Sequence, residues 1–117
     1  MATFLLKGIQ TAAAAIGSGY GFMAIGHGTT AENISQNGCI SEDMRVASSN
    51  TIITTTNTSD TSQHVGTFTI VAATLAMTEA VVMSAASAGN GAARSKFDVI
   101  NLITNDVVAL TFKFVVS

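Results

Sequence analysis

Residues 105–117 read NDVVALTFKFVVS and alternate between apolar and polar side chains over most of their length. Side chains of a β-strand point to opposite faces in turn, so residues two apart share a face. The apolar face that this period predicts consists of Leu110, Phe112, Phe114 and Val116. Thr111 and Lys113 fall on the other face. The stretch therefore predicts a half-buried strand whose Leu110, Phe112 and Phe114 supply the core together with Phe68.

Two stretches upstream also have the composition of strands. Residues 45–56 are rich in β-branched side chains, which suit a pleated surface, and fit one long strand or two short ones. Residues 63–73 carry apolar groups on both faces. The Ser- and Thr-rich segment 58–62 lies between them, and its side chains compete with regular backbone pairing. These three segments predict a hairpin.

A second hairpin is predicted farther along the chain. Residues 77–85 and 92–100 flank a tight turn at 88–91, whose glycines and asparagine tolerate positive φ. Residues 20–26 are typical of a short buried strand, and the polar stretch 29–38 that follows fits a loop or one helical turn. About six strands at regular spacing with polar turns predict a small all-β domain, an antiparallel β-sandwich.

The N-terminal segment has a different period. Its apolar residues recur at three- and four-residue spacing, and they are Leu5, Leu6, Ile9, Ala12, Ala13 and Ile16. The alanines favour a helix, and Gly17 and Gly19 would end it. The segment is therefore expected to form either one short helix or a strand followed by coil.

Length and charge limit the function classes. The chain has 117 residues, and two separate cores would have about 60 residues each, a marginal size, so we expect one domain spanning residues 1–117. The net charge is −2, so the chain lacks the excess of Lys and Arg that is typical of proteins that bind nucleic acid. Charged residues make up 10% of the chain, against about 25% in an average soluble domain, while 48% are hydrophobic. This imbalance predicts that other protein subunits cover much of the surface.

Neither a membrane span nor a secretory signal is predicted. No stretch reaches the roughly 18 consecutive apolar residues that a spanning helix needs. The first residues, up to Lys7, lack the basic region that begins a secretory signal. We therefore expect a soluble chain made in the cytoplasm of the cell that produces it.

Few residues suggest chemistry. His27 and His64 lie far apart in the sequence with the lone Cys39 between them, so the spacing predicts no metal site, and no cofactor motif is present. Glu79 is the one charge in an apolar run and needs either a proton or a cation. No base, nucleophile or metal motif accompanies Glu79, so we expect no enzyme. Arg94, across the second turn, is the expected partner in a structural ion pair.

Five side chains are candidate contacts to a partner protein. Aromatic residues and arginine are enriched at the centres of interfaces, which makes Tyr20 and Phe22 candidate anchors. The candidates for contact with an acidic partner surface are Arg45, Arg94 and Lys96. The absence of proline also leaves predicted strand edges without one common protection against pairing.

Several segments carry a resemblance. Residues 22–31 read FMAIGHGTTA, residues 77–80 read MTEA and residues 94–101 read RSKFDVIN. They resemble, in the same order, the segments AIGTGTTA, ITEAG and R-x-x-F-x-x-I-N of small tailed-bacteriophage virion structural proteins. The Thr-rich hairpin with Val65 to Thr69 and the segment AASAG at 85–89, similar to NAASGG, fit the same order. The resemblance covers about residues 20–116.

The resemblance implies a compact β protein of a phage head or tail. With the low charge of the chain, it favours a capsid decoration (cement) protein, which binds the outer surface of the head through broad uncharged contacts. The expected partner is the major capsid protein, and a homotrimer or another homo-oligomer is the expected assembly. The alternative is a tail, baseplate or fibre component, whose partners would be tail proteins. The chain would be made in the host cytoplasm and reside in the virion.

Overall fold

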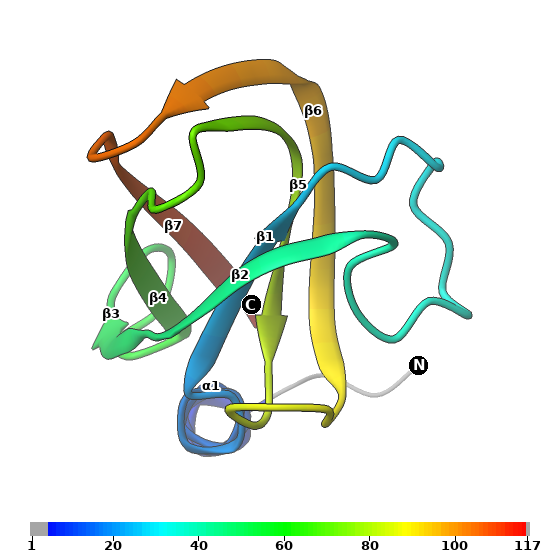
Figure 1. Cartoon of the computed structure of the whole chain (residues 1–117). Coiled ribbons are helices and arrows are strands. Elements are labelled where there is room, and N and C mark those ends of the chain that lie inside the picture. The colour runs from blue at the N-terminus through cyan, green and yellow to red at the C-terminus, as the bar shows by residue number, and fades with distance from the viewer. Residues whose placement is uncertain (1–4, 117) are drawn as a thin grey trace.

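The computed structural model of the chain describes residues 5–116, which form one helix and seven strands. In chain order these elements are α1 (Leu6–Gly19), β1 (Phe22–Gly26), β2 (Glu42–Ala47), β3 (Ser49–Ile53), β4 (Thr61–Thr69), β5 (Thr74–Met83), β6 (Gly91–Ile103) and β7 (Val107–Val115). Figure 1 shows the helix end-on below two layers of strands. The N-terminal segment is thus a helix rather than a strand followed by coil.

The strands form two antiparallel sheets. The four-stranded sheet has the order β2-β1-β5-β6, and the three-stranded sheet has the order β3-β4-β7 (Figure 1). The two expected hairpins are present, because β3 pairs with β4 and β5 pairs with β6. The small all-β sandwich predicted from the sequence, with one short N-terminal helix, is therefore confirmed.

The stretch at 45–56 is divided between the two sheets. β2 ends at Ala47 in the four-stranded sheet, and β3 begins at Ser49 in the three-stranded sheet. The chain crosses between the sheets at Ser48, whose N–H donates to the Gly21 carbonyl at 2.9 Å. Two short strands, not one long strand, therefore occupy this stretch, and they close one side of the sandwich.

The main core lies between the sheets. Its largest completely buried side chains are Phe68, Met23, Ile25, Ile70 and Met77. Phe68 thus has the expected core position. Leu110, Phe112 and Phe114 alternate with exposed residues along β7, as expected, but they are only half-buried and pack against the edge of this core. Their partial exposure follows from the position of β7 at the edge of its sheet.

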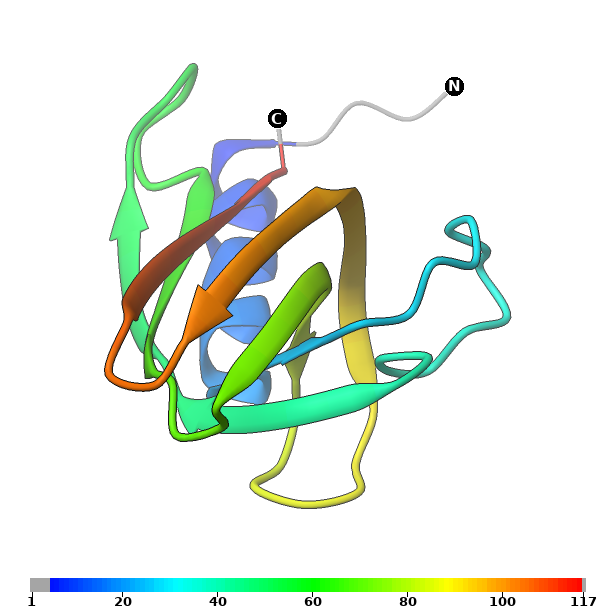
Figure 2. The ribbon, with the colours of Figure 1, turned by 45° about the horizontal axis from the view of Figure 1, so that its top comes forward.

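The helix α1 packs against β3 and β4 (Figure 2). Its buried residues, Ile9, Ala13 and Gly17, recur every four residues and so lie on one face. Gly17 lies against the Asn50 side chain of β3, so closely that a Cβ at this position would overlap it. The helix therefore needs glycine at its closest approach to the sheet.

The side of the sandwich opposite Ser48 is open. β6 and β7 are joined by the turn at 104–106 but belong to different sheets and do not pair with each other in the described residues. Figure 1 shows them diverging from this turn. Each therefore leaves one edge of backbone N–H and C=O groups without a neighbouring strand.

Candidate interaction surface on the outer face of the four-stranded sheet

The loop between β1 and β2, residues 27–41, covers the outer face of the four-stranded sheet. Ala24, Val81 and Met83 are buried there in a second apolar cluster, against which Cys39 of the loop packs. Successive strand residues point to opposite faces, so β5 is buried on its inner face by the other sheet and on its outer face by this loop. The loop therefore completes the fold on this side.

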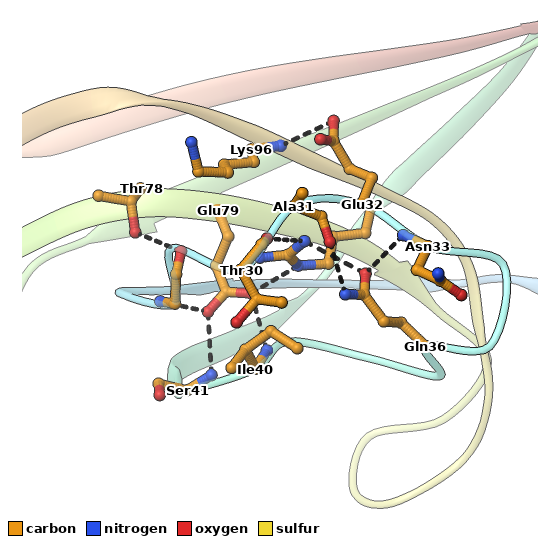
Figure 3. A network of polar contacts seen from close by, with 12 residues as sticks. Thr30, Ala31, Glu32, Asn33, Gln36, Ile40, Ser41, Thr78, Glu79 and Lys96 are labelled. Carbon is orange, nitrogen blue, oxygen red and sulfur yellow. Dashed lines mark hydrogen bonds and ion pairs between the residues drawn. The ribbon is translucent and has the colours of Figure 1, made fainter.

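Glu79 of β5 fixes the loop to the sheet. Its side chain is completely buried, and its carboxylate accepts hydrogen bonds from the backbone N–H groups of Gly28 at 2.5 Å, Ile40 at 2.8 Å and Ser41 at 3.0 Å. Figure 3 shows the carboxylate pointing toward Ile40 and Ser41. These three donors belong to the two ends of the loop. One side chain thus holds both ends in place.

Arg94 of β6 completes the arrangement. Its Nε lies 2.9 Å from Glu79 Oε1, so the ion pair expected from the sequence is formed, with side-chain exposures of 5% and 0%. Its Nη1 donates to the Thr30 carbonyl at 2.8 Å and to Gln36 Oε1 at 3.2 Å. The guanidinium therefore ties the middle of the loop to the same carboxylate that holds its ends.

These contacts determine the ionisation of Glu79. Burial alone raises the pKa of a carboxyl group, but the hydrogen bond from Arg94 and those from the backbone of Ser41, Ile40 and Gly28 outweigh burial, and the pKa of Glu79 lies below its usual value. The group is therefore an ionised structural carboxylate. Its four hydrogen bonds all go to groups that hold the loop against the sheet.

Two glycines allow the loop to approach this closely. A Cβ on Gly28 would overlap the Glu79 carboxylate and the Ile40 side chain, and a Cβ on Gly26 would overlap the Ser41 carbonyl. Thr78 adds a further contact, because its hydroxyl donates to the Gly28 carbonyl at 2.7 Å. The chain therefore needs small residues at the point where the loop leaves β1.

A pocket of about 480 Å³ lies between the loop and β6. Glu32, Gln36 and Asn37 line it on the loop side, and Arg94 lines it on the strand side. Its remaining lining residues, most of them small or apolar, are Asn33, Ile34, Gly38, Val81, Gly91, Ala92 and Ala93. This size is typical of ligand pockets.

The other candidate interface residues do not join this site. Tyr20 is half-buried against the main core, and Phe22 is half-buried against the second apolar cluster. Lys96 is exposed beside the pocket. Arg94, by contrast, is buried, so the expectation of an exposed contact to an acidic surface needs correction for this residue: its charge is already paired within the chain.

Arg45 is also occupied within the chain. Its guanidinium makes two hydrogen bonds to Glu42, at 2.6 and 3.0 Å, and Nη1 donates to the carbonyls of Ala85 and Ala88. Hydrogen bonding to Glu42 raises its pKa. Arg45 therefore holds the β5–β6 turn against β2, a role that its place in the sequence did not indicate.

A second polar pair was not foreseen from the sequence. His27 Nδ1 lies 2.8 Å from Asp43 Oδ2 beside a cavity of about 270 Å³, also lined by Val71 and Leu75. The pairing of β1 with β2 brings these residues together across 16 positions of sequence. Within residues 5–116, no group of three or more His, Cys, Asp or Glu side chains is arranged to hold a metal ion.

No protein-family model, curated protein or solved structure matches this chain. Among the described residues, no helix combines the length and the apolar character needed to cross a membrane.

Proposed function

We propose that this chain is a bacteriophage decoration protein that binds the outer surface of the major capsid lattice and stabilises the head. The observation that carries the proposal is a cluster of exposed aliphatic side chains at one end of the sandwich. We call this cluster, formed by Val71, Ile103 and Val107, the aliphatic end. These side chains are 79%, 60% and 63% exposed.

Hydrogen bonds between two turns hold the aliphatic end together. Asn105 N–H donates to the Ile70 carbonyl at 2.7 Å, and Ile70 N–H donates to the Asp106 carbonyl at 2.8 Å. They place Val71 beside the β6–β7 turn. Gathered aliphatic side chains on a rigid surface are typical of a site that another protein covers, because their exposure to water is unfavourable.

The free edges of β6 and β7 extend from the same turn. An unpaired strand edge is usually protected by proline, bulges or many charges, and this chain has no proline and only 10% charged residues. Such unprotected edges are typical of a protein that functions in contact with other subunits. The order of the phage-like segments in the sequence supports a phage structural protein, and the low charge of the chain favours the head lattice over the tail as its partner surface.

The same features favour assembly of the chain with itself. A homotrimer or another symmetric homo-oligomer would cover further free edges and would match the symmetry of a capsomer surface. The oligomer would be made in the host cytoplasm and reside on the phage head, with the major capsid protein as its partner.

Binding to heads tests the proposal. Purified protein is mixed with heads of the phage that encodes it, prepared from a mutant that lacks this chain, and the heads are sedimented. We expect the protein to co-sediment and to raise the temperature at which the heads release their DNA. Val71→Asp should weaken binding, because it places a charge in the aliphatic end. Val115→Asp, at an exposed position at the opposite end of β7 from the aliphatic end, is the control and should bind normally.

Failure of the wild-type protein to bind heads would contradict the proposal. Gold labelling confined to tails would replace it with the tail, baseplate or fibre alternative. Equal loss of binding in both variants would show that the aliphatic end is not the contact.

A further inference from the structure

The edge of β6 that faces the pocket has an unsatisfied backbone. In the β5–β6 pairing, Val81 is opposite Arg94 and Glu79 is opposite Lys96. Lys96 N–H points away from β5, since it donates to Glu32 Oε2 of the loop at 3.3 Å. In an antiparallel strand, residues two apart direct their N–H and C=O groups to the same side. The Arg94 backbone therefore also points away from β5, into the pocket that this residue lines.

Loop groups form hydrogen bonds with the outward-facing backbone of β6 on either side of Arg94. Lys96 N–H is bonded to Glu32 at one end, and Gly91 N–H donates to the Asn37 carbonyl at 2.9 Å at the other. Between these points, no loop group within residues 5–116 is paired with the backbone of Arg94. Its Nη2 also lacks a partner within the same residues, although it is buried. The Arg94 backbone thus offers one donor and one acceptor on the side of β6 that the loop contacts.

The buried charge that lines the pocket is already paired. Arg94 is neutralised by Glu79, and the exposed Glu32 carboxylate lies near both Arg94 and Lys96, which contribute to the lowering of its pKa after its backbone hydrogen bonds. An anionic ligand would therefore find the charge of Arg94 already balanced. Next to Arg94 on the strand side of the pocket are three small residues, Gly91, Ala92 and Ala93, which leave room for a backbone to approach. An uncharged chain with alternating N–H and C=O groups complements such a surface.

We propose that this pocket receives an extended, uncharged segment of the major capsid protein, which adds to β6 as a short strand and forms backbone hydrogen bonds with Arg94. This inference rests on the proposed function for the source of the segment. Strand addition of this kind takes its affinity from main-chain hydrogen bonds and its specificity from the pockets beside the edge. The Glu79 and Arg94 contacts fix the loop relative to β5 and β6, so we expect little ordering of the loop on binding.

The loop also supplies an apolar contact at the rim. Ile34 lines the pocket while its side chain is fully exposed, and it follows Asn33, whose side-chain oxygen fixes the local turn by accepting from Ser35 N–H at 2.9 Å. An aliphatic side chain held in water on an ordered loop can pack against the entering segment. It would cover the side of that segment that faces away from β6.

Ala92→Arg tests the proposal. Ala92 is exposed and lines the pocket, so a long side chain there would fill the pocket without disturbing the core. Ala47→Arg is the matched control, because Ala47 is an exposed residue of β2, the opposite edge strand of the same sheet. In sedimentation with heads that lack the chain, we expect Ala92→Arg to reduce the affinity at least about tenfold and Ala47→Arg to leave it nearly unchanged.

Hydrogen exchange of the bound protein provides a second measurement. We expect the Arg94 amide to exchange rapidly in the free protein and to become protected on heads, whereas the amides of Ala93 and Ser95, which face β5, are protected in both. Heads that bind wild type and Ala92→Arg equally, or that leave the Arg94 amide unprotected, would overturn this inference and leave the decoration role intact. Heads that bind no wild-type protein would overturn both.

Discussion

Two buried carboxylates, Glu79 and Asp60, organise two different loops of this molecule. Both side chains are completely buried, and both accept several backbone N–H groups. The donors to Asp60 are Thr55, Thr56 and Asn57, three to five residues before it. The donors to Glu79 lie 38 to 51 residues away in sequence. The same chemistry therefore stabilises one local turn and one long-range contact.

The difference in sequence separation determines which parts of the fold must form before each site can form. The Asp60 turn can close as soon as the chain before β4 bends, because all these partners are neighbours in sequence. The loop at 27–41 can be fixed only after β1, β5 and β6 have paired, since Glu79 and Arg94 come from different strands. We infer that the Glu79 site depends on the whole sheet, whereas the backbone donors of the Asp60 carboxylate come from its own segment.

The largest expected effect is that of Glu79→Gln. The substitution keeps the shape of the side chain but leaves the buried Arg94 guanidinium without its charge partner, and breaking a buried pair in this way costs about 3–5 kcal/mol. We expect this loss in the free energy of unfolding, measured with urea. A loss below 1 kcal/mol, of the order of a surface ion pair, would contradict the role given to Glu79.

A smaller loss is expected for Asp60→Asn. The amide can still accept from Thr55 through its oxygen, but its NH₂ group cannot accept from Thr56 and Asn57, which bond to the second carboxylate oxygen. Leaving such buried donors unsatisfied costs about 1–3 kcal/mol. Chemical unfolding should show this loss, with the Arg94 amide exchanging as in the wild type. A change at Arg94 would mean that the two sites are coupled.

Acid should weaken the fold in two stages. Burial lowers the pKa of His64 from its usual 6.5, opposed by the Tyr20 backbone, so the folded state favours neutral His64 and stability falls as the pH drops below 6.5. The pKa of Glu79 is also lowered from its usual 4.5, so its contribution is present above pH 4.5 and is lost as the pH falls through its lower folded-state pKa. Unfolding curves across pH 3 to 8 measure both stages.

The two stages can be separated by substitution. His64→Gln should remove the decrease that begins near pH 6.5, and Glu79→Gln should remove the decrease below pH 4.5. Persistence of the lower stage in Glu79→Gln would assign it to another carboxylate.

The smallest expected effect is on the rate at which Cys39 reacts with a thiol reagent. This rate reports on the loop at 27–41 alone. Burial, with Glu79 and Glu42 nearby, raises the pKa of the Cys39 thiol to about 12, so at pH 8 only about one molecule in ten thousand carries the reactive thiolate. A thiol reagent such as dithionitrobenzoate should therefore react slowly with the native protein. Glu79→Gln should accelerate the reaction by releasing the loop, while Asp60→Asn should not. Equal rates of Cys39 reaction in the two variants would contradict the claim that Glu79, and not Asp60, fixes the loop at 27–41.

The sequence predicts the sheets better than it predicts the loops. Alternation of apolar residues identifies β7, and the paired segments around residues 58–62 and 88–91 identify both hairpins, because period and turn chemistry are local. The choice between helix and strand at the N-terminus is not local. It depends on the packing of Ile9, Ala13 and Gly17 against β3 and β4, which only the folded sheet provides.

The same limit applies to the candidate site. Glu79 could be found because it is a lone charge in an apolar run, and Arg94 because an antiparallel turn brings it back beside β5. The backbone donors of Gly28, Ile40 and Ser41 have no sequence signal, since every residue carries such a group. The free edge at Arg94 likewise becomes visible only once the register of β5 with β6 is known.

The most direct test of the account is an electron cryomicroscopy reconstruction of particles of the phage that encodes this chain. We expect its density on the outside of the head, with the aliphatic end against the lattice and a strand of capsid protein beside Arg94 of β6. Density on the tail, or a particle without this chain, would contradict the account.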